Sequence, residues 1–268
     1  MASLYEKRSK KIWLTSQLKS FFIQDSLTRI SRKNELRDYL SILKKSDQKL
    51  WHLHKSLEGI RKKSQLKYQS YDYGNGYYYQ SLQSINITGY RDTENRLKLL
   101  QLPSKLRGKR VLDIGSNSGF LIISLADRLK KGVGVEFNPY LVETAKTVQK
   151  YFEIDNLEFL PMSFENYQSE EKFDAVLSLA NHSTYDQNTH QTLDDYFKKI
   201  SSLLSEDGEL IFESHPPQIE PAEKLAETLK VISKYFSIED RPTVKLKGFM
   251  DRDRAYVFAK KWQKHNQK

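Results

Sequence analysis

The chain contains glycines and carboxylates whose spacing is typical of a nucleotide-binding site. The run DIGSNSG begins at Asp113, near the end of a strand pattern, and contains Gly115 and Gly119. Glycines in such a turn let backbone N–H groups approach a ligand closely. Glu136 closes the next strand pattern, 23 residues after Asp113, where a carboxylate can accept hydrogen bonds from both ribose hydroxyls. The spacing predicts a site for an adenosyl ligand and differs from the GxGxxG run of dinucleotide-binding proteins.

Strand and helix patterns alternate on both sides of this turn. Strand patterns cover residues 110–116, 132–137, 157–162, 173–180, 209–214, 238–246 and 254–260. Helix patterns lie between them at residues 117–130, 141–152, 189–205 and 221–236. Apolar strands that alternate with helices are typical of an α/β fold with a mostly parallel sheet and helices on both faces.

The composition is that of a globular protein. The 268 residues are 38% hydrophobic and 29% charged, which provides a sizeable core. The absence of cysteine excludes disulfide bonds, cysteine-ligated zinc, iron–sulfur clusters and a cysteine nucleophile. No apolar run approaches the roughly 20 residues that span a bilayer, and no signal-peptide cleavage site follows the N-terminal segment. We therefore expect a cytoplasmic protein without a membrane span.

The positive charge is concentrated in the first third of the chain. Residues 1–90 contain 17 Lys and Arg against 7 Asp and Glu, whereas residues 91–268 contain 27 of each. Leucines at helical spacing indicate amphipathic helices, so we expect a basic helical region over residues 1–67. Its surface would attract RNA, an anionic lipid head group or a phosphorylated metabolite. The alternative is an ordinary solvated helix face.

A tyrosine-rich connector follows at residues 68–90. Its first twelve residues hold six tyrosines, and a Gly-Asn-Gly run favours a turn over a helix. Tyrosine rings stack on purines or sugars, and their hydroxyls form hydrogen bonds. We therefore expect a lid whose Tyr73, Tyr78 and Tyr79 contact a substrate. The alternative is that the rings pack back on the core.

Three segments resemble the class I S-adenosylmethionine-dependent methyltransferases. They are VLDIGSNSGF, GVEFNP and FDAVLSLANHS, and the resemblance covers about residues 88–262. It implies that residues 91–268 form a Rossmann-like domain with a seven-stranded sheet whose last strand is antiparallel. It also implies an enzyme that uses S-adenosylmethionine (SAM), bound over the ends of the first, second and fourth strands.

The resemblance assigns the cofactor loop and the ribose contact. Gly115, Asn117 and Gly119 would form the loop, with Asp113 near the methionine end of SAM. Glu136 would bind the ribose. Asn117 stands where the family has its middle glycine, a variation that is compatible with binding.

The remaining cofactor contacts follow the second, third and fourth strands. By the resemblance, Phe137 would flank the adenine, and Ser163 and Phe164 would meet its edge. Leu179 and Asn181 would face the methyl group. The family often has an acid where Ser163 stands, so adenine recognition differs at this position.

An arginine upstream of the first strand is a further candidate. Arg91 lies in the run GYRDT, just before the helix pattern that leads into the first strand. A guanidinium group binds a carboxylate through paired, charge-assisted hydrogen bonds. Arg91 is therefore a candidate for the SAM carboxylate, and the alternative is a surface arginine at a helix start.

A histidine after the fourth strand stands where a catalytic base is needed. Methyl transfer to a hydroxyl requires alignment of donor and acceptor and removal of a proton. The ordinary pKa of histidine suits this near neutral pH, so we expect His182 as the base, oriented by Asp186. The alternative is that His182 only holds its loop. His215, after the fifth strand, is a candidate substrate contact, and no metal-ligand spacing occurs, so no metal is expected.

The acceptor is suggested by surface chemistry. Basic helices favour an anionic acceptor and tyrosines favour one with a ring, so we expect a small anionic molecule or a sugar. The segment LANH stands where amino-methylating enzymes carry NPPY, which favours an oxygen acceptor. One alternative is an RNA (tRNA) methyltransferase that docks through the basic helices. Another is a non-catalytic methyltransferase-like subunit that binds RNA or a partner. The sequence carries no signal for an oligomeric state.

Overall fold

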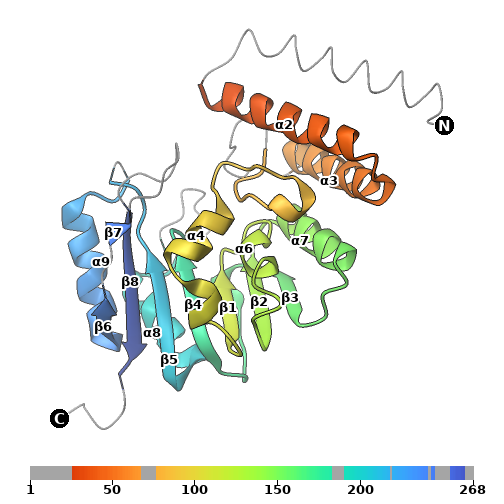
Figure 1. Cartoon of the computed structure of the whole chain (residues 1–268). Coiled ribbons are helices and arrows are strands. Elements are labelled where there is room, and N and C mark those ends of the chain that lie inside the picture. Colours follow the sequence, from red (N-terminus) through yellow and green to blue (C-terminus); the bar gives the residue numbers. More distant parts are fainter. Residues whose placement is uncertain are drawn as a thin grey trace.

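A central sheet with helices on both faces forms the body of the protein (Figure 1). The computed structural model describes residues 26–67, 77–182, 190–217, 219–240, 243–244 and 254–262. Within these residues, no helix is long and apolar enough to cross a bilayer.

The sheet has the strand order β3-β2-β1-β4-β5-β8-β6 among the described residues, and the short β7 pairs with β8 beside this path. The strands are β1 (Arg110–Ile114), β2 (Lys131–Glu136), β3 (Leu157–Pro161), β4 (Phe173–Leu179), β5 (Leu204–Glu213), β6 (Phe236–Asp240), β7 (Thr243–Val244) and β8 (Arg254–Lys261). β1 to β5 are parallel, and β8 runs antiparallel between β5 and β6. The expected seven-stranded sheet with an antiparallel last strand is confirmed.

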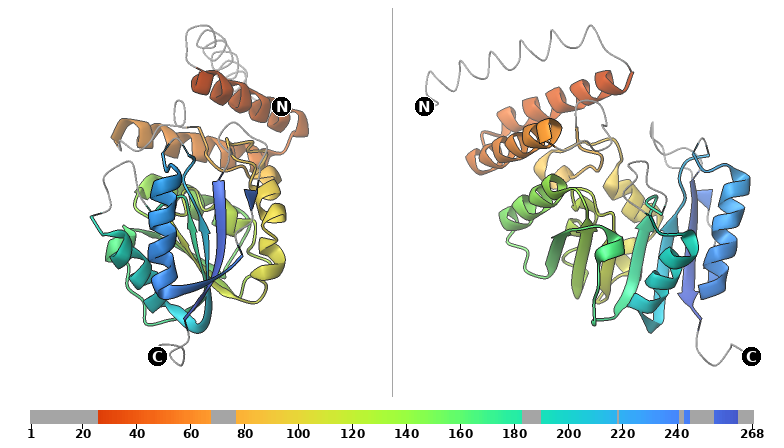
Figure 2. Two further views of the ribbon diagram at one scale, coloured as in Figure 1. Left: turned by 90° about the vertical axis from the view of Figure 1, so that its left-hand side faces the viewer. Right: turned by 180° about the vertical axis from the view of Figure 1, so that it is seen from behind.

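Alternate side chains of the strands bury two separate apolar layers. Val111 and Leu177 pack on one face with α4 (Thr93–Leu99), α5 (Leu102–Lys105), α6 (Phe120–Ile123) and α7 (Pro139–Tyr151). Leu112 and Val176 pack on the other face with α8 (Leu193–Leu203) and α9 (Ala222–Tyr235). Figure 2 shows the helices on the two sides of the sheet. The period-two pattern of the strands explains both layers.

Two elements differ from the sequence-based expectation. The helix expected at 117–130 is wrong in length, because α6 ends at Ile123 and turns follow it. The N–H groups of Leu125, Ala126 and Arg128 bond to carbonyls three residues back, which is the tighter 3-10 pattern. β5 begins at Leu204, earlier than expected, because its pairing with β4 continues across a register shift.

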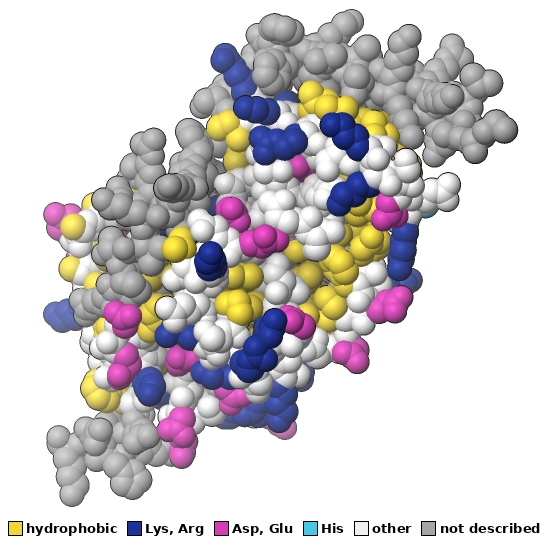
Figure 3. Space-filling model, in the orientation of Figure 1, with side chains coloured by type: hydrophobic (Ala, Val, Ile, Leu, Met, Phe, Trp, Pro, Cys, Tyr) yellow, Lys and Arg dark blue, Asp and Glu magenta, His cyan; other side chains and the backbone are white. Residues whose placement is uncertain are grey.

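Two N-terminal helices lie over the edge of the sheet where β1 and β2 end. They are α2 (Ser26–Lys45) and α3 (Gln48–Lys67), and α3 packs against α7. The carboxylate of Asp38 on α2 accepts a hydrogen bond from the backbone N–H of Thr88 at 2.8 Å and another from the Tyr77 hydroxyl. Lys and Arg side chains gather on the outer surface of the pair (Figure 3).

Gly119 occupies a position that only glycine fits. Its φ is +69°, and a Cβ there would lie 2.4 Å from Cε1 of Phe159. Gly108 has a φ of +70°, and a Cβ added there would meet no atom within 4 Å. Alanine at position 108 would therefore carry only the conformational cost of a positive φ, without a steric clash. We expect Gly119→Ala to lower the free energy of unfolding by about 1–3 kcal/mol more than Gly108→Ala, measured by urea unfolding. Equal losses in the two variants would contradict this steric account.

Candidate active site

A cavity opens at the carboxyl ends of β1, β2 and β4. It contains about 440 Å³ of empty space, part of it open to solvent. Five residues expected at the cofactor line it: Gly115, Phe137, Ser163, Phe164 and Asn181. Val135 and Met162 add apolar surface, while Glu165 and Gln191 add polar groups. Apolar walls with a few polar groups suit an adenine ring.

Asn181 is held rigidly against the glycine turn. Ala180 has a φ of +58°, a left-handed conformation that directs the chain back toward β1. The amide of Asn181 donates to the carbonyl of Ile114, and its Oδ1 accepts from the Tyr196 hydroxyl at 3.0 Å. A Cβ on Gly115 would lie 2.9 Å from Nδ2 of Asn181, so glycine is needed for this approach. Tyr196 was not found from the sequence, because it lies in α8 without a motif.

The carboxylate of Glu136 joins the glycine turn to α7. Its Oε2 accepts from the N–H of Asn117 at 3.0 Å, and its Oε1 accepts from the N–H of Asn138 at 3.0 Å. Asn117 has a φ of +54°, so it takes the left-handed conformation that the family's glycine would supply. The glycine turn and Glu136, both expected at the cofactor, are thus in contact. Its carboxylate can accept further hydrogen bonds, as a ribose diol requires.

Asp113 is buried at the end of β1 with an unsatisfied carboxylate oxygen. Asp113 is 3% exposed, and its Oδ2 has no hydrogen-bond partner. Burial raises the pKa of Asp113 to about 7, although the charge of Arg96 lowers it, and Glu136 raises it further. A cationic group would satisfy this oxygen, and the amino group of SAM is such a group. The cavity lined by Gly115 and Phe137, which we call the adenine cavity, and the carboxylates of Glu136 and Asp113 therefore offer groups that suit the adenine, ribose and amino parts of SAM.

Other predicted residues are not among those that line this cavity. Leu179 packs in the layer that faces α4. The Arg91 guanidinium donates to Glu213 at 2.8 Å and to the Tyr79 hydroxyl at 3.1 Å, so a contact with the SAM carboxylate stays a prediction. Tyr78 packs on Phe120 with 5.7 Å between ring centroids. Tyr73 and Asp186 lie outside the described residues.

His182 is buried in a polar cluster beyond the end of β4. Its Nε2 lies 2.9 Å from Oε1 of Glu220, and its ring lies 4.8 Å from that of His215. Nδ1 of His182 is buried and has no hydrogen-bond partner. Burial raises the pKa of Glu220, but hydrogen bonds from His182, Thr228 and the His215 N–H, with the charge of His182, lower it to about 2.

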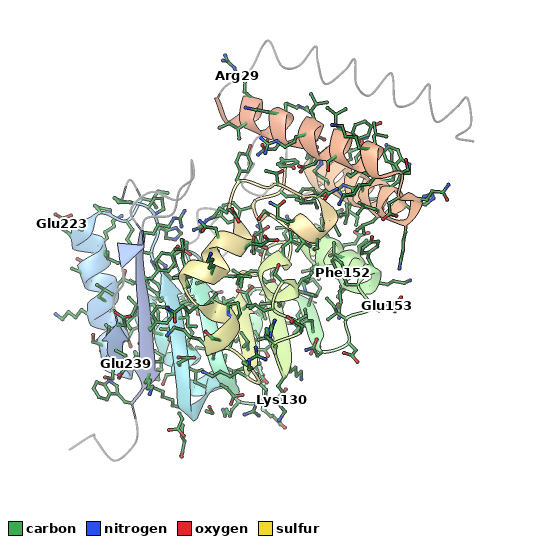
Figure 4. The ribbon with its side chains drawn as sticks, viewed as in Figure 1. Arg29, Lys130, Phe152, Glu153, Glu223 and Glu239 are labelled. Atoms are coloured by element: carbon green, nitrogen blue, oxygen red, sulfur yellow. The ribbon has the colours of Figure 1, made fainter. Side chains whose placement is uncertain are left out.

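Glu220 escaped the sequence analysis because nothing local links it to His182. It lies 38 residues further on, just before α9. Glu223, in the first turn of that helix, lies at the left of Figure 4, and Phe152 and Glu153 lie at the opposite edge of the molecule. Within the described part of the chain, no three His, Asp or Glu side chains gather as metal ligands.

Loss of the Glu136 carboxylate is expected to weaken cofactor binding strongly. Glu136→Ala removes both potential ribose acceptors and the bonds to Asn117 and Asn138. We expect the affinity for S-adenosylhomocysteine to fall at least tenfold, measured by isothermal titration calorimetry. Glu158→Ala, an exposed carboxylate on β3, serves as the control. A Glu136→Ala protein that binds as tightly as the parent would show that the ribose lies elsewhere.

Comparisons with known proteins agree with this site. A family model described as a methyltransferase domain matches residues 105–262, more than half of the chain. A protein of Methanocaldococcus jannaschii, named as a candidate protein N5-glutamine methyltransferase (MJ0928), is 36% identical over 89 residues. That stretch is 33% of this chain and 44% of the relative, so the chain spans less than half of that protein.

Solved structures share the fold. The N-methyltransferase NodS from Bradyrhizobium japonicum WM9 superposes with a TM-score of 0.52 at 15% identity, over 63% of this chain and 94% of that chain. NodS has also been solved with S-adenosylhomocysteine. The PH0226 protein from Pyrococcus horikoshii OT3 superposes with a TM-score of 0.51 at 19% identity, over 65% and 95% of the two chains. With the family match over 105–262 and a cavity whose lining suits the cofactor, the chain belongs to the methyltransferase-domain family and contains a SAM-dependent methyltransferase domain.

Proposed function

We propose that this enzyme methylates an oxygen atom of an anionic small molecule or sugar, with His182 as the general base. The observation that carries the proposal is the pairing of His182 with Glu220, which leaves Nδ1 buried and without a hydrogen-bond partner. A buried, unpaired nitrogen is costly unless a ligand satisfies it. His182 directly follows Asn181, which lines the cofactor cavity.

The Glu220 carboxylate selects the tautomer that a base needs. An ionised carboxylate accepts only, so Nε2 of His182 carries the proton and Nδ1 keeps its lone pair. SAM supplies an electrophilic methyl group on a positively charged sulfur. The acceptor oxygen forms the new bond to the methyl carbon as the carbon–sulfur bond breaks, and sulfur keeps that electron pair. The hydroxyl proton passes to Nδ1 of His182, and Glu220 stabilises the cation that results.

The acceptor class follows from charge and ring surfaces. The net positive charge of the chain lies within residues 1–90, and α3 from this region lines a second cavity beside the glycine turn. Tyr78 and Tyr79 line the same cavity. A positive surface raises the local concentration of anions, and tyrosine rings stack on sugars or bases. An anionic acceptor with a ring meets both conditions.

Methylation of a protein glutamine is a second candidate, because the relative from M. jannaschii bears that name. The segment after β4 here is Leu179-Ala-Asn-His, without the NPPY run of amino-methylating enzymes, and this favours oxygen. An RNA acceptor docked on α2 and α3 is a third candidate. A non-catalytic subunit is disfavoured, because Glu136 bonds to the glycine turn and Asp113 has a buried oxygen without a hydrogen-bond partner, and a chain without a cofactor has no need of either.

A labelling experiment separates these candidates. The purified chain is incubated with methyl-labelled SAM and an extract of its source cell, which is then divided into RNA, protein and RNase-treated small-molecule and glycan fractions. We expect label in the small-molecule and glycan fraction. Mild base should remove this label only if the acceptor is a carboxyl oxygen, because methyl esters hydrolyse and methyl ethers do not. Label only in RNA or only in protein would replace the proposed acceptor, and absence of label from every fraction would contradict the enzyme's activity on these classes.

A further inference from the structure

Three arginines converge on one carboxylate at the active-site edge of the sheet. Glu213 accepts hydrogen bonds from Arg91 at 2.8 Å and from Arg96. Nη1 of Arg254 lies 3.1 Å from Oε1 of Glu213. All four side chains are at most 4% exposed. We call these four residues the arginine cluster. Burying several charged side chains together costs free energy, so the cluster must serve either a function or a strong structural role.

The arginine cluster lies on the side of β4 that faces away from the adenine cavity. Glu213 ends β5 and Arg254 begins β8, whereas the adenine cavity lies at β1 and β2. Neighbouring strands are about 4.8 Å apart, so Glu213 is roughly 10 Å from β1 across the sheet. Leu179, expected next to the methyl group, pairs in register with Glu213. The arginine cluster therefore stands on the acceptor side of the expected methyl position.

The cluster is strongly positive. Burial and the neighbouring Arg91 lower the pKa of Arg96 to about 10. Burial raises the pKa of Tyr79, yet the charges of Arg91, Arg254 and Arg96 lower it below the ordinary value. Nε of Arg96 is buried without a hydrogen-bond partner. An oxyanion would satisfy this donor and reduce the repulsion among the guanidinium groups.

Tyr79 connects the arginine cluster to open space. Its ring is half-buried and lines the second cavity, which contains about 520 Å³ of empty space between α3, the glycine turn and α7. Its hydroxyl lies 3.1 Å from Nη1 of Arg91. Tyr79 therefore lines the second cavity and also contacts the arginine cluster.

We propose that the arginine cluster, with the Tyr79 hydroxyl, binds a carboxylate or phosphoryl oxyanion of the methyl acceptor. Guanidinium groups match both oxyanions through paired hydrogen bonds. The inference deepens the proposed function and rests on its anionic acceptor. It makes Arg96 and Tyr79 determinants of substrate specificity and leaves the chemistry to other residues.

The test measures anion binding without methyl transfer. Full-length protein saturated with S-adenosylhomocysteine is titrated with inorganic phosphate and, separately, with acetate at constant ionic strength, and the rise in melting temperature gives the affinity. We expect Arg96→Gln to weaken binding of the preferred anion at least tenfold, and Tyr79→Phe, which keeps the ring, about threefold to tenfold. The stronger of the two anions identifies a phosphoryl or a carboxylate acceptor.

Arg110→Gln is the matched control, because Arg110 pairs with Asp174 at the opposite end of β1. Its anion affinity should equal the parent's. Parent protein that binds neither anion, or unchanged affinity in both Arg96→Gln and Tyr79→Phe, would overturn the proposal. So would an Arg96→Gln protein that, well above the pKa of Asp113, loses affinity for S-adenosylhomocysteine but not for methylthioadenosine, which lacks the amino acid end, since the arginine cluster would then hold the cofactor carboxylate. Because no turnover is measured, failure of His182 as the base leaves these outcomes unaffected.

Discussion

Replacing His182 by glutamine is expected to slow methyl transfer by about 10²–10⁴-fold while SAM affinity stays within about twofold of the parent's. Glutamine keeps a polar side chain but cannot take a proton at neutral pH. His182 contacts Glu220, Phe212 and His215 and is absent from the lining of the adenine cavity, so the cofactor should be unaffected. Single-turnover transfer to the labelled acceptor fraction measures the rate, and calorimetry measures SAM affinity.

Glu220→Gln distinguishes catalysis from a role in holding the loop. Glutamine keeps the bond to His182 but no longer dictates its tautomer, so we expect a loss of turnover near tenfold or more with an unchanged KM. His52→Gln on the exposed side of α3 is the control. Normal turnover in His182→Gln would mean that this histidine only holds its loop.

The parts of the site that were predicted from the sequence depend on local spacing. Gly115, Asn117 and Glu136 follow neighbouring parallel strands, so their meeting is dictated by the pairing of β1 with β2. Helices on both faces of the sheet were predicted because continuous apolar strand patterns alternate with helix patterns along the chain. Five of the cofactor residues line one cavity for the same reason, since each follows the end of a strand.

The parts that escaped prediction depend on contacts between distant segments. Glu213 meets Arg91 across 122 positions of the chain, and no pattern marks one charged residue as the partner of another. Glu220 lies 2.9 Å from His182 and 38 positions away in the chain, while the predicted partner Asp186 lies outside the described residues. α6 was predicted too long because Leu125 and Leu129 continue the helical spacing of Leu121 beyond Ile123, although the chain forms turns there.

The affinity for S-adenosylhomocysteine is expected to rise with pH up to about 7 and then level off. Asp113 is the group responsible, since burial raises its pKa to about 7. The cationic amino end of the ligand prefers the ionised carboxylate, so binding below pH 7 must first remove a proton. The affinity should therefore change by up to about tenfold per pH unit in that window. Calorimetry between pH 5 and 8 in buffers of different ionisation enthalpy measures both the affinity and the proton released.

Asp113→Asn should separate ligand binding from stability, because we expect it to lower the affinity for S-adenosylhomocysteine and to raise the free energy of unfolding. The folded pKa of Asp113 lies above the unfolded value, so the folded state holds a proton between about pH 4 and 7 that the unfolded chain has released. Stability from this group is present at low pH and falls by up to about 1.4 kcal/mol per unit as pH rises through the window. At pH 8, Asp113→Asn should therefore unfold at a higher urea concentration than the parent yet bind S-adenosylhomocysteine at least tenfold more weakly, without pH dependence.

Asp174→Asn is the control with the opposite sign. The hydrogen bond from Arg110 lowers the pKa of Asp174, so this carboxylate stabilises the fold above its unfolded pKa, and asparagine should cost stability at pH 8. It lies at the edge of the sheet away from the cofactor, so ligand affinity should not change. A cofactor affinity that stays flat with pH in the parent, or an Asp113→Asn protein that both binds normally and gains no stability, would mean that Asp113 is not the acidic partner of the methionine end. If stability rises and affinity falls together, the buried carboxylate is destabilising in the free enzyme because it is kept for the cation it binds.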